Sequence, residues 1–186
     1  MQFFPKKLSQ IYLVLFVSAF LTITGNFTFF QKTLLVYPLS ENWLFLGSLF
    51  FFLFTFLAAL LLLFCYRATT KPILIVLLMI SAIVSYSTNN YGIVFDHNMI
   101  LNTFETDTSE FLDLVSFKSI LYFFIFGLLP SIFVLKVKLK KISFKAQLWE
   151  RIKTFLALVI IFVILVLTFS KHYSSFAREN RDLRLY

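Results

Sequence analysis

The sequence predicts an all-α membrane protein with five transmembrane helices and short interfacial helices between the third and fourth spans. The chain of 186 residues is 60% hydrophobic and 14% charged, with a mean hydropathy of +0.88, which lies outside the usual range of soluble domains. Its 27 Phe cannot all be hidden in a water-soluble core of this size, because such a domain still exposes roughly a third of the surface of its unfolded chain. Lipid must therefore solvate many of them.

Five runs of spanning length lack charged side chains. They cover about 8–31, 43–66, 72–88, 119–135 and 154–170. At about 1.5 Å per helical residue, each run crosses or nearly crosses a hydrocarbon core of about 30 Å. The last three are short, so they are expected to recruit flanking residues or to thin the bilayer locally. Helix is the expected backbone, because unpaired strand amides are costly in lipid and the runs show no period-two alternation.

Two of the runs carry additional local signals. The first follows Lys6 and Lys7 as a signal peptide would, but it is too long for a signal core and no clear A-x-A cleavage site follows, which favours a retained anchor. The fourth contains Gly127 and Pro130. Because proline has no amide hydrogen, Pro130 is expected to kink this helix or to bend it around a neighbour.

The charged residues between the runs predict an orientation. With the N-terminus in the cytoplasm, Glu150 is the only acid among the inside segments, and their cations are Lys6, Lys7, Arg67, Lys71, Lys136, Lys138, Lys140, Lys141, Lys145, Arg151 and Lys153. Five spans then place the C-terminus outside, in agreement with the positive-inside rule. Because these cations adjoin apolar runs, membrane lipids with anionic headgroups are expected partners, and nucleic acid is not.

An island of polar residues interrupts the apolar runs between residues 91 and 113. Its sequence, YGIVFDHNMILNTFETDTSEFLD, contains five of the nine acids of the chain and no Lys or Arg. Asp96 suits an N-cap, and Asp107 with Glu110 has the spacing of a capping box. The segment 89–118 is therefore expected to form two interfacial helices on the outer face, joined near Thr106.

Three residues of this island are candidates for binding a lipid headgroup. Asn102, Thr106 and Glu110 are spaced i, i+4 and i+8, and the expected joint could still direct them to one site. Carboxylates attract ammonium groups, while amides and hydroxyls can hydrogen-bond phosphate or ester oxygens. A zwitterionic head such as phosphoethanolamine fits that set. The alternative is that the acids cap helices and stay solvated.

The sequence contains no recognisable catalytic or metal-binding motif. There is no Ser/His/Asp arrangement, no H-E-x-x-H and no Gly-rich phosphate loop. His97 and His172 lack the spacing of zinc ligands, and the single Cys65 is interpreted as a structural thiol. No catalytic residue, metal ligand or cofactor is expected in this chain.

Three patches resemble the membrane portion of the lipid A phosphoethanolamine transferases, a family that includes the mobile colistin-resistance enzymes. The first is Tyr91-Gly92-Ile93-Val94 followed by Asp96, Met99, Asn102, Thr106 and Glu110. The second is NFTFF at 26–30 followed by Tyr37-Pro38, and the third is YSSFAR at 173–178. The resemblance is specific because the three patches occur in the right order at the right spans.

The resemblance implies an enzyme of two parts, in which five membrane helices precede a periplasmic domain with zinc and a threonine nucleophile. Such an enzyme moves phosphoethanolamine from phosphatidylethanolamine to lipid A in the bacterial inner membrane, which gives polymyxin resistance. By this resemblance Asn102, Thr106 and Glu110 bind substrate, and Tyr91 is a weaker candidate. The sequence ends at Tyr186, so the chain is expected to be the membrane domain, inactive without the catalytic domain of the same parent chain.

Two alternatives remain open at this point. One is a stand-alone membrane scaffold or transport protein, although the five runs contain none of the ionisable residues that usually mark ion or proton pathways. The other is the anchor of a related headgroup transferase with a different acceptor. The sequence does not separate the possible acceptors.

Overall fold

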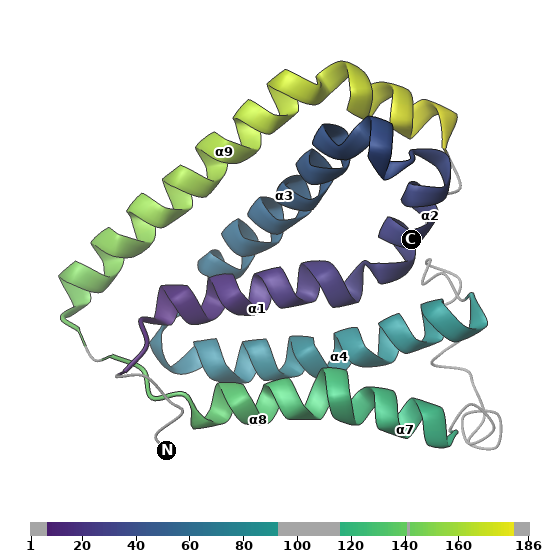
Figure 1. Ribbon diagram of the computed structural model, residues 1–186. Coiled ribbons are helices and arrows are strands. Elements are labelled where there is room, and N and C mark those ends of the chain that lie inside the picture. Colours follow the sequence, from purple (N-terminus) through teal and green to yellow (C-terminus); the bar gives the residue numbers. More distant parts are fainter. Residues whose placement is uncertain (1–6, 93–115, 141, 181–186) are drawn as a thin grey trace, which may run out of the picture.

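The computed structural model describes residues 7–92, 116–140 and 142–180 (Figure 1). The helices are α1 (Gln10–Gly25), α2 (Phe27–Val36), α3 (Leu39–Phe64), η1 (Arg67–Thr69), α4 (Thr70–Tyr91), α7 (Phe117–Phe123), η2 (Phe124–Leu128), α8 (Leu129–Lys136) and α9 (Phe144–Glu179). An isolated parallel β-bridge joins Leu8 to Leu139. The predicted all-α class is confirmed, while the predicted interfacial helices lie outside the described residues.

The described helices supply the predicted membrane spans. Four of them, 39–64, 67–91, 117–136 and 144–179, are long and apolar enough to cross a membrane. Helices α1 and α2 meet at a 57° bend and make the fifth if they form one span. Asn26 has non-helical backbone angles between them, and its side chain donates a hydrogen bond to the Thr22 carbonyl at 3.2 Å. The first apolar run therefore forms two helices with a bend between them and not one straight helix.

Helix α9 extends well beyond the charge-free run 154–170. Its 36 residues correspond to about 54 Å at the helical rise per residue, far more than the hydrocarbon core of about 30 Å. Lys153 and Lys171 lie just outside the charge-free run, where their side chains can reach the headgroups. Flanking polar turns, continuous with the apolar run, therefore supply the length that the run lacks.

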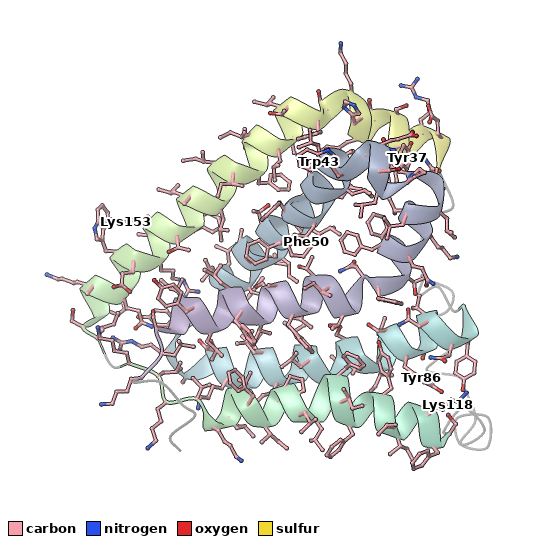
Figure 2. The ribbon with its side chains drawn as sticks, viewed as in Figure 1. Tyr37, Trp43, Phe50, Tyr86, Lys118 and Lys153 are labelled. Atoms are coloured by element: carbon pink, nitrogen blue, oxygen red, sulfur yellow. The ribbon has the colours of Figure 1, made fainter. Side chains whose placement is uncertain are left out.

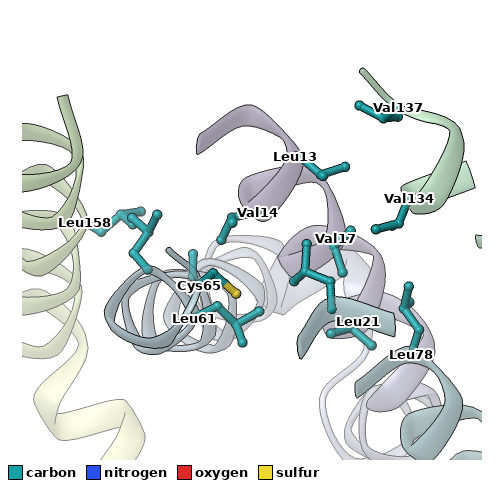
Figure 3. Close-up of a cluster of buried hydrophobic side chains, with 13 residues drawn as sticks. Leu13, Val14, Val17, Leu21, Leu61, Cys65, Leu78, Val134, Val137 and Leu158 are labelled. Carbon is teal, nitrogen blue, oxygen red and sulfur yellow. The ribbon is translucent and has the colours of Figure 1, made fainter. Parts of the chain in front are cut away.

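Helix α1 lies at the centre of the bundle, between α3 and α4. On one side α3 also packs against α9, and on the other α4 also packs against α7, η2 and α8 (Figure 1). The core is built mainly from leucine and valine side chains. Leu13 and Val14 of α1 belong to the same buried cluster as Leu61 of α3 and Leu78 of α4 (Figure 3). These contacts leave much of α9 and the outer faces of the other helices to lipid.

The fourth span changes its helical pitch ahead of Pro130. Residues 124–128 form the π-helical turn η2, in which the Leu129 amide donates to the Phe124 carbonyl. This wider turn accommodates the missing amide hydrogen of Pro130, since π-turns are one of the identifiable ways in which a helix bends. The predicted distortion of this helix is therefore found one turn before the proline.

Cys65 lies in the connection between α3 and η1, where its thiol is buried. Desolvation raises the pKa of the Cys65 thiol to about 11, and the positive charge of Arg151 only partly offsets that effect. Iodoacetamide reacts with the thiolate, so we expect Cys65 at pH 8 to react at least about a hundredfold more slowly than an exposed cysteine. Mass spectrometry of the alkylated protein measures this rate.

A Ser174→Cys variant in a Cys65→Ala background supplies the exposed control thiol at the far end of α9. The raised pKa also makes the stability of the protein depend on pH. The contribution of the neutral Cys65 thiol to the free energy of unfolding is complete below pH 9 and is lost as pH rises toward 11. Equal alkylation rates for Cys65 and Cys at position 174 would contradict the buried position of the thiol.

Candidate functional site

The polar island leaves and re-enters the bundle at one end. Helix α4 ends at Tyr91 and is capped by Gly92, whose φ of +65° is the left-handed conformation that glycine tolerates. Helix α7 begins after Ser116, whose hydroxyl accepts a hydrogen bond from the Ser119 amide in a capping box. Of the predicted site residues, Tyr91 is described, whereas Asn102, Thr106 and Glu110 lie outside the described residues.

Three tyrosines gather where the island meets the bundle, and we call Tyr86, Tyr91 and Tyr122 the tyrosine cluster. The Tyr86 ring is 5.8 Å from that of Tyr91, edge to face, and 5.5 Å from that of Tyr122. Tyr86 is buried, while Tyr91 is 44% exposed. Figure 2 shows Tyr86 and Lys118 at the end of the bundle opposite Lys153. Phenol groups therefore line the place from which the acidic segment emerges.

Hydrogen bonds hold this cluster to the neighbouring helices. The hydroxyls of Tyr86 and Ser116 are 2.9 Å apart, which ties α4 to the start of α7. Asn89 donates to the Tyr122 hydroxyl at 3.3 Å, and the Thr28 hydroxyl of α2 donates to the Asn89 side-chain carbonyl. The end of α4 and the start of α7, which flank the island, are thus held together in one hydrogen-bonded frame, and that frame also contacts α2.

A second group of rings lies beside α2, and we call Phe29, Tyr37, Phe45 and Phe176 the aromatic corner. Phe176 of α9 has its ring 6.1 Å from that of Phe29, 5.7 Å from that of Tyr37 and 5.7 Å from that of Phe45. The Asn180 amide donates to the Tyr37 hydroxyl at 3.5 Å. The end of α9 is therefore packed against the α2–α3 connection.

The two groups bring together patches that are far apart in the sequence. Phe29 and Tyr37 come from the second patch described above and Phe176 from the third, and Thr28 links the second patch to the helix that ends at Tyr91. Sequence reasoning missed Tyr86, Asn89 and Tyr122. Asn89 and Asn90 directly precede Tyr91. Their polar amides at the end of an apolar run were the signal from which Asn89 could have been identified.

The side chains described at this end of the bundle carry hydrogen-bonding groups. Phenols, amides and hydroxyls can donate to phosphate or ester oxygens, but they form no nucleophile–base pair. Within residues 7–92, 116–140 and 142–180, no three His, Cys, Asp or Glu side chains are grouped so that they could hold a metal ion. The zinc implied by the resemblance therefore does not fit the described side chains.

Comparison with known proteins relates the chain to a group of transferases. The family model described as phosphoethanolamine transferase EptA/EptB matches residues 53–186. Phosphatidylethanolamine transferase Mcr-1 of Escherichia coli is 36% identical over 98% of this chain and 34% of its own length. Mcr-2 of the same species is 34% identical over 91% of this chain and 32% of its own. The chain spans about a third of the length of these curated relatives.

A solved structure matches the fold as a whole. It is the integral membrane protein lipooligosaccharide phosphoethanolamine transferase A of Neisseria meningitidis, with a TM-score of 0.88 and 23% sequence identity. The match covers 97% of this chain and 34% of that protein. The arrangement of the described helices is therefore that of the membrane part of an integral membrane protein.

Proposed function

Because this chain belongs to the phosphoethanolamine transferase EptA/EptB family, we propose that it is the membrane anchor and lipid-docking domain of an enzyme. That enzyme transfers phosphoethanolamine from phosphatidylethanolamine to lipid A. The observation that carries the proposal is the family match over residues 53–186. The hydrogen bonds among Tyr86, Ser116, Asn89 and Tyr122 support the docking role, because they hold the residues that flank the acidic island among groups that can bind phosphate. The catalytic step belongs to a catalytic domain joined to this one.

In this proposal the island binds the headgroup of the lipid. The Glu110 carboxylate pairs with the ammonium of phosphoethanolamine, while Asn102 and Thr106 donate hydrogen bonds to its phosphate oxygens. The Tyr91 phenol adds a donor at the edge of the bundle. An exposed carboxylate–ammonium pair gains only about 1 kcal/mol, so these residues position the lipid and share its binding energy.

The zinc of the proposed enzyme is assigned to its catalytic domain. The described side chains of this chain offer no set of ligands for zinc, so these residues take no part in metal binding. Their part is to hold the donor lipid at the membrane surface and to keep it in place for the nucleophile.

We also propose that the protein lies in the bacterial inner membrane with its N-terminus in the cytoplasm. The starts of α1, α4 and α9 and the end of α8 lie at one end of the bundle, together with the cations Lys71, Lys138, Lys140, Arg151 and Lys153. The excess of Lys and Arg at this end supports a cytoplasmic location for it. The tyrosine cluster then faces the periplasm, where lipid A is modified in this proposal.

A chimaera tests the function and the site together. This chain replaces the matched third of Mcr-1, and mass spectrometry of lipid A from cells that produce the chimaera reports the added phosphoethanolamine. We expect modified lipid A with the unaltered chain and roughly fivefold less with Glu110→Ala, which corresponds to a loss of about 1 kcal/mol of headgroup binding.

The matched control is Glu41→Ala, which removes an exposed acid at the start of α3. It should leave the modification unchanged, with all variants at equal amounts in the membrane. Unmodified lipid A from a correctly inserted chimaera would refute the function. Equal modification by the Glu110→Ala chimaera and the unaltered one would refute the site alone.

A further inference from the structure

A cavity of about 430 Å³ opens at the end of the bundle opposite the tyrosine cluster. We call this cavity the basic cavity. It lies between the start of α1, the connection between α8 and α9, and the first turns of α9. Its polar wall includes Ser9, Lys140, Glu150, Lys153 and Thr154. Its apolar wall includes Ile11, Leu15 and Ile142. The cavity therefore joins charged groups to a hydrocarbon surface within one space.

The lysines of the basic cavity are held at its edge without being neutralised. The backbone amide of Lys140 donates to the Leu8 carbonyl at 2.9 Å, which fixes the connection against the N-terminal segment. The Lys153 ammonium lies 5.1 Å from the centre of the Trp149 ring, a cation–π contact that preserves its charge. Within the described part of the chain, neither ammonium forms an ion pair.

The amide side chains at the back of the basic cavity are already engaged. Gln10 donates to the Cys65 carbonyl at 3.1 Å and to the Thr70 hydroxyl, and Gln147 donates to the Gln10 side-chain carbonyl. Arg67 donates to the Gln147 carbonyl oxygen at 3.2 Å. The Thr154 hydroxyl donates to the Glu150 backbone carbonyl at 2.9 Å. Ligand recognition in the cavity is therefore assigned to the two lysines, the Glu150 carboxylate and the Ser9 hydroxyl.

We propose that the basic cavity binds the headgroup of an anionic phospholipid of the phosphatidylglycerol class. The ammonium groups of Lys140 and Lys153 contact the phosphodiester, and the Glu150 carboxylate accepts hydrogen bonds from the glycerol hydroxyls. The acyl chains follow the apolar wall toward the lipid-exposed side of α1. A free phosphate ion would leave that wall bare, so the amphipathic lining points to a lipid.

Charge decides between an anionic and a zwitterionic headgroup. Glu150 could accept an ammonium group, but the wall carries two lysines, and Lys138, Lys145 and Arg151 are nearby in the sequence on the same elements. This surplus of positive charge repels an ammonium and attracts a net negative lipid. The bound lipid would bridge α1 to α9, two helices joined here by the Gln147–Gln10 hydrogen bond.

Native mass spectrometry of the full chain in detergent, with equimolar phosphatidylglycerol and phosphatidylethanolamine, tests this site. We expect phosphatidylglycerol adducts to be about tenfold more abundant than phosphatidylethanolamine adducts, since each lysine near an anionic lipid raises the affinity about a few-fold. The double variant Lys140→Ala/Lys153→Ala should lose that preference. The matched control, Lys118→Ala/Lys171→Ala, removes two exposed lysines from the opposite end. It should keep the preference.

A fluorescence measurement locates the lipid. In a Trp43→Phe background the remaining Trp149 lies beside Lys153, and brominated phosphatidylglycerol in vesicles should quench it more than brominated phosphatidylethanolamine does. The excess quenching should vanish in the milder double variant Lys140→Gln/Lys153→Gln. Equal binding of the two lipids by the unaltered chain, an undiminished preference in both double variants, or displacement by inorganic phosphate alone would each overturn the proposal.

Discussion

Replacing Phe176 by alanine is expected to lower the free energy of unfolding by about 3–5 kcal/mol, the usual cost of removing a buried phenylalanine ring. Phe176 is 8% exposed and contacts the rings of Phe29, Tyr37 and Phe45. Its loss leaves a cavity that these three rings can fill only in part. The end of α9 should then separate from the α2–α3 connection. Thermal unfolding in detergent, followed by loss of the monodisperse fraction, measures the change.

Phe117→Ala is the matched control for Phe176→Ala. Phe117 begins α7 and is 80% exposed, so its ring contacts lipid or detergent and its removal should change stability little. In the Mcr-1 chimaera, Phe176→Ala should also reduce lipid A modification, because Phe176 packs on Phe29 of α2, and the adjacent Thr28 hydrogen-bonds Asn89 near the end of α4. Equal stability of the two variants would show that the aromatic corner does not hold α9.

Replacing Gly127 by leucine is expected to destabilise the chain by about 1–3 kcal/mol, as overpacking of a close helix contact does. A Cβ atom at Gly127 would lie 3.2 Å from the Ala82 Cβ atom and 3.3 Å from the Phe123 ring. Helix α4 and the π-turn η2 approach closely because small residues meet there, as in other membrane helix pairs. The larger side chain must push the two helices apart.

Gly47→Leu provides the comparison for Gly127→Leu. Gly47 lies in α3, and a Cβ atom there would meet nothing within 4 Å. Because glycine is a poor helix former, this substitution should be neutral or slightly stabilising. Thermal unfolding of the two variants under identical conditions separates the effect of packing from that of helix propensity. A Gly127→Leu protein as stable as Gly47→Leu would contradict the close approach.

Much of the fold could be predicted from local sequence, because lipid imposes simple requirements on it. The charge-free run 43–66 corresponds closely to α3 (Leu39–Phe64), since apolar length alone selects a spanning helix. The first run was harder, because the 57° bend at Asn26 lies within apolar residues and carries no charge. Helix α9 was longer than its run because polar flanking turns continue a helix after its apolar stretch has ended.

The candidate site could be predicted only in part. Asn102, Thr106 and Glu110 were chosen from their residue types and from the family resemblance, and they stay predictions. Tyr86 and Tyr122 were not singled out, since tyrosine in an apolar run has the same appearance whether it faces lipid, core or site. Their role in the frame became visible from the hydrogen bonds to Ser116 and Asn89.

By itself, the sequence determined the all-α membrane class and the separation of positive charge from the acidic island. These properties depend on composition along the chain, because apolar length decides which segments cross the bilayer and flanking charge decides their orientation. Only the tertiary structure decided that Phe176 would meet Phe29 and Tyr37, and that Lys140 would share a cavity with Lys153. Such contacts join distant segments, and they depend on how the helices pack against one another.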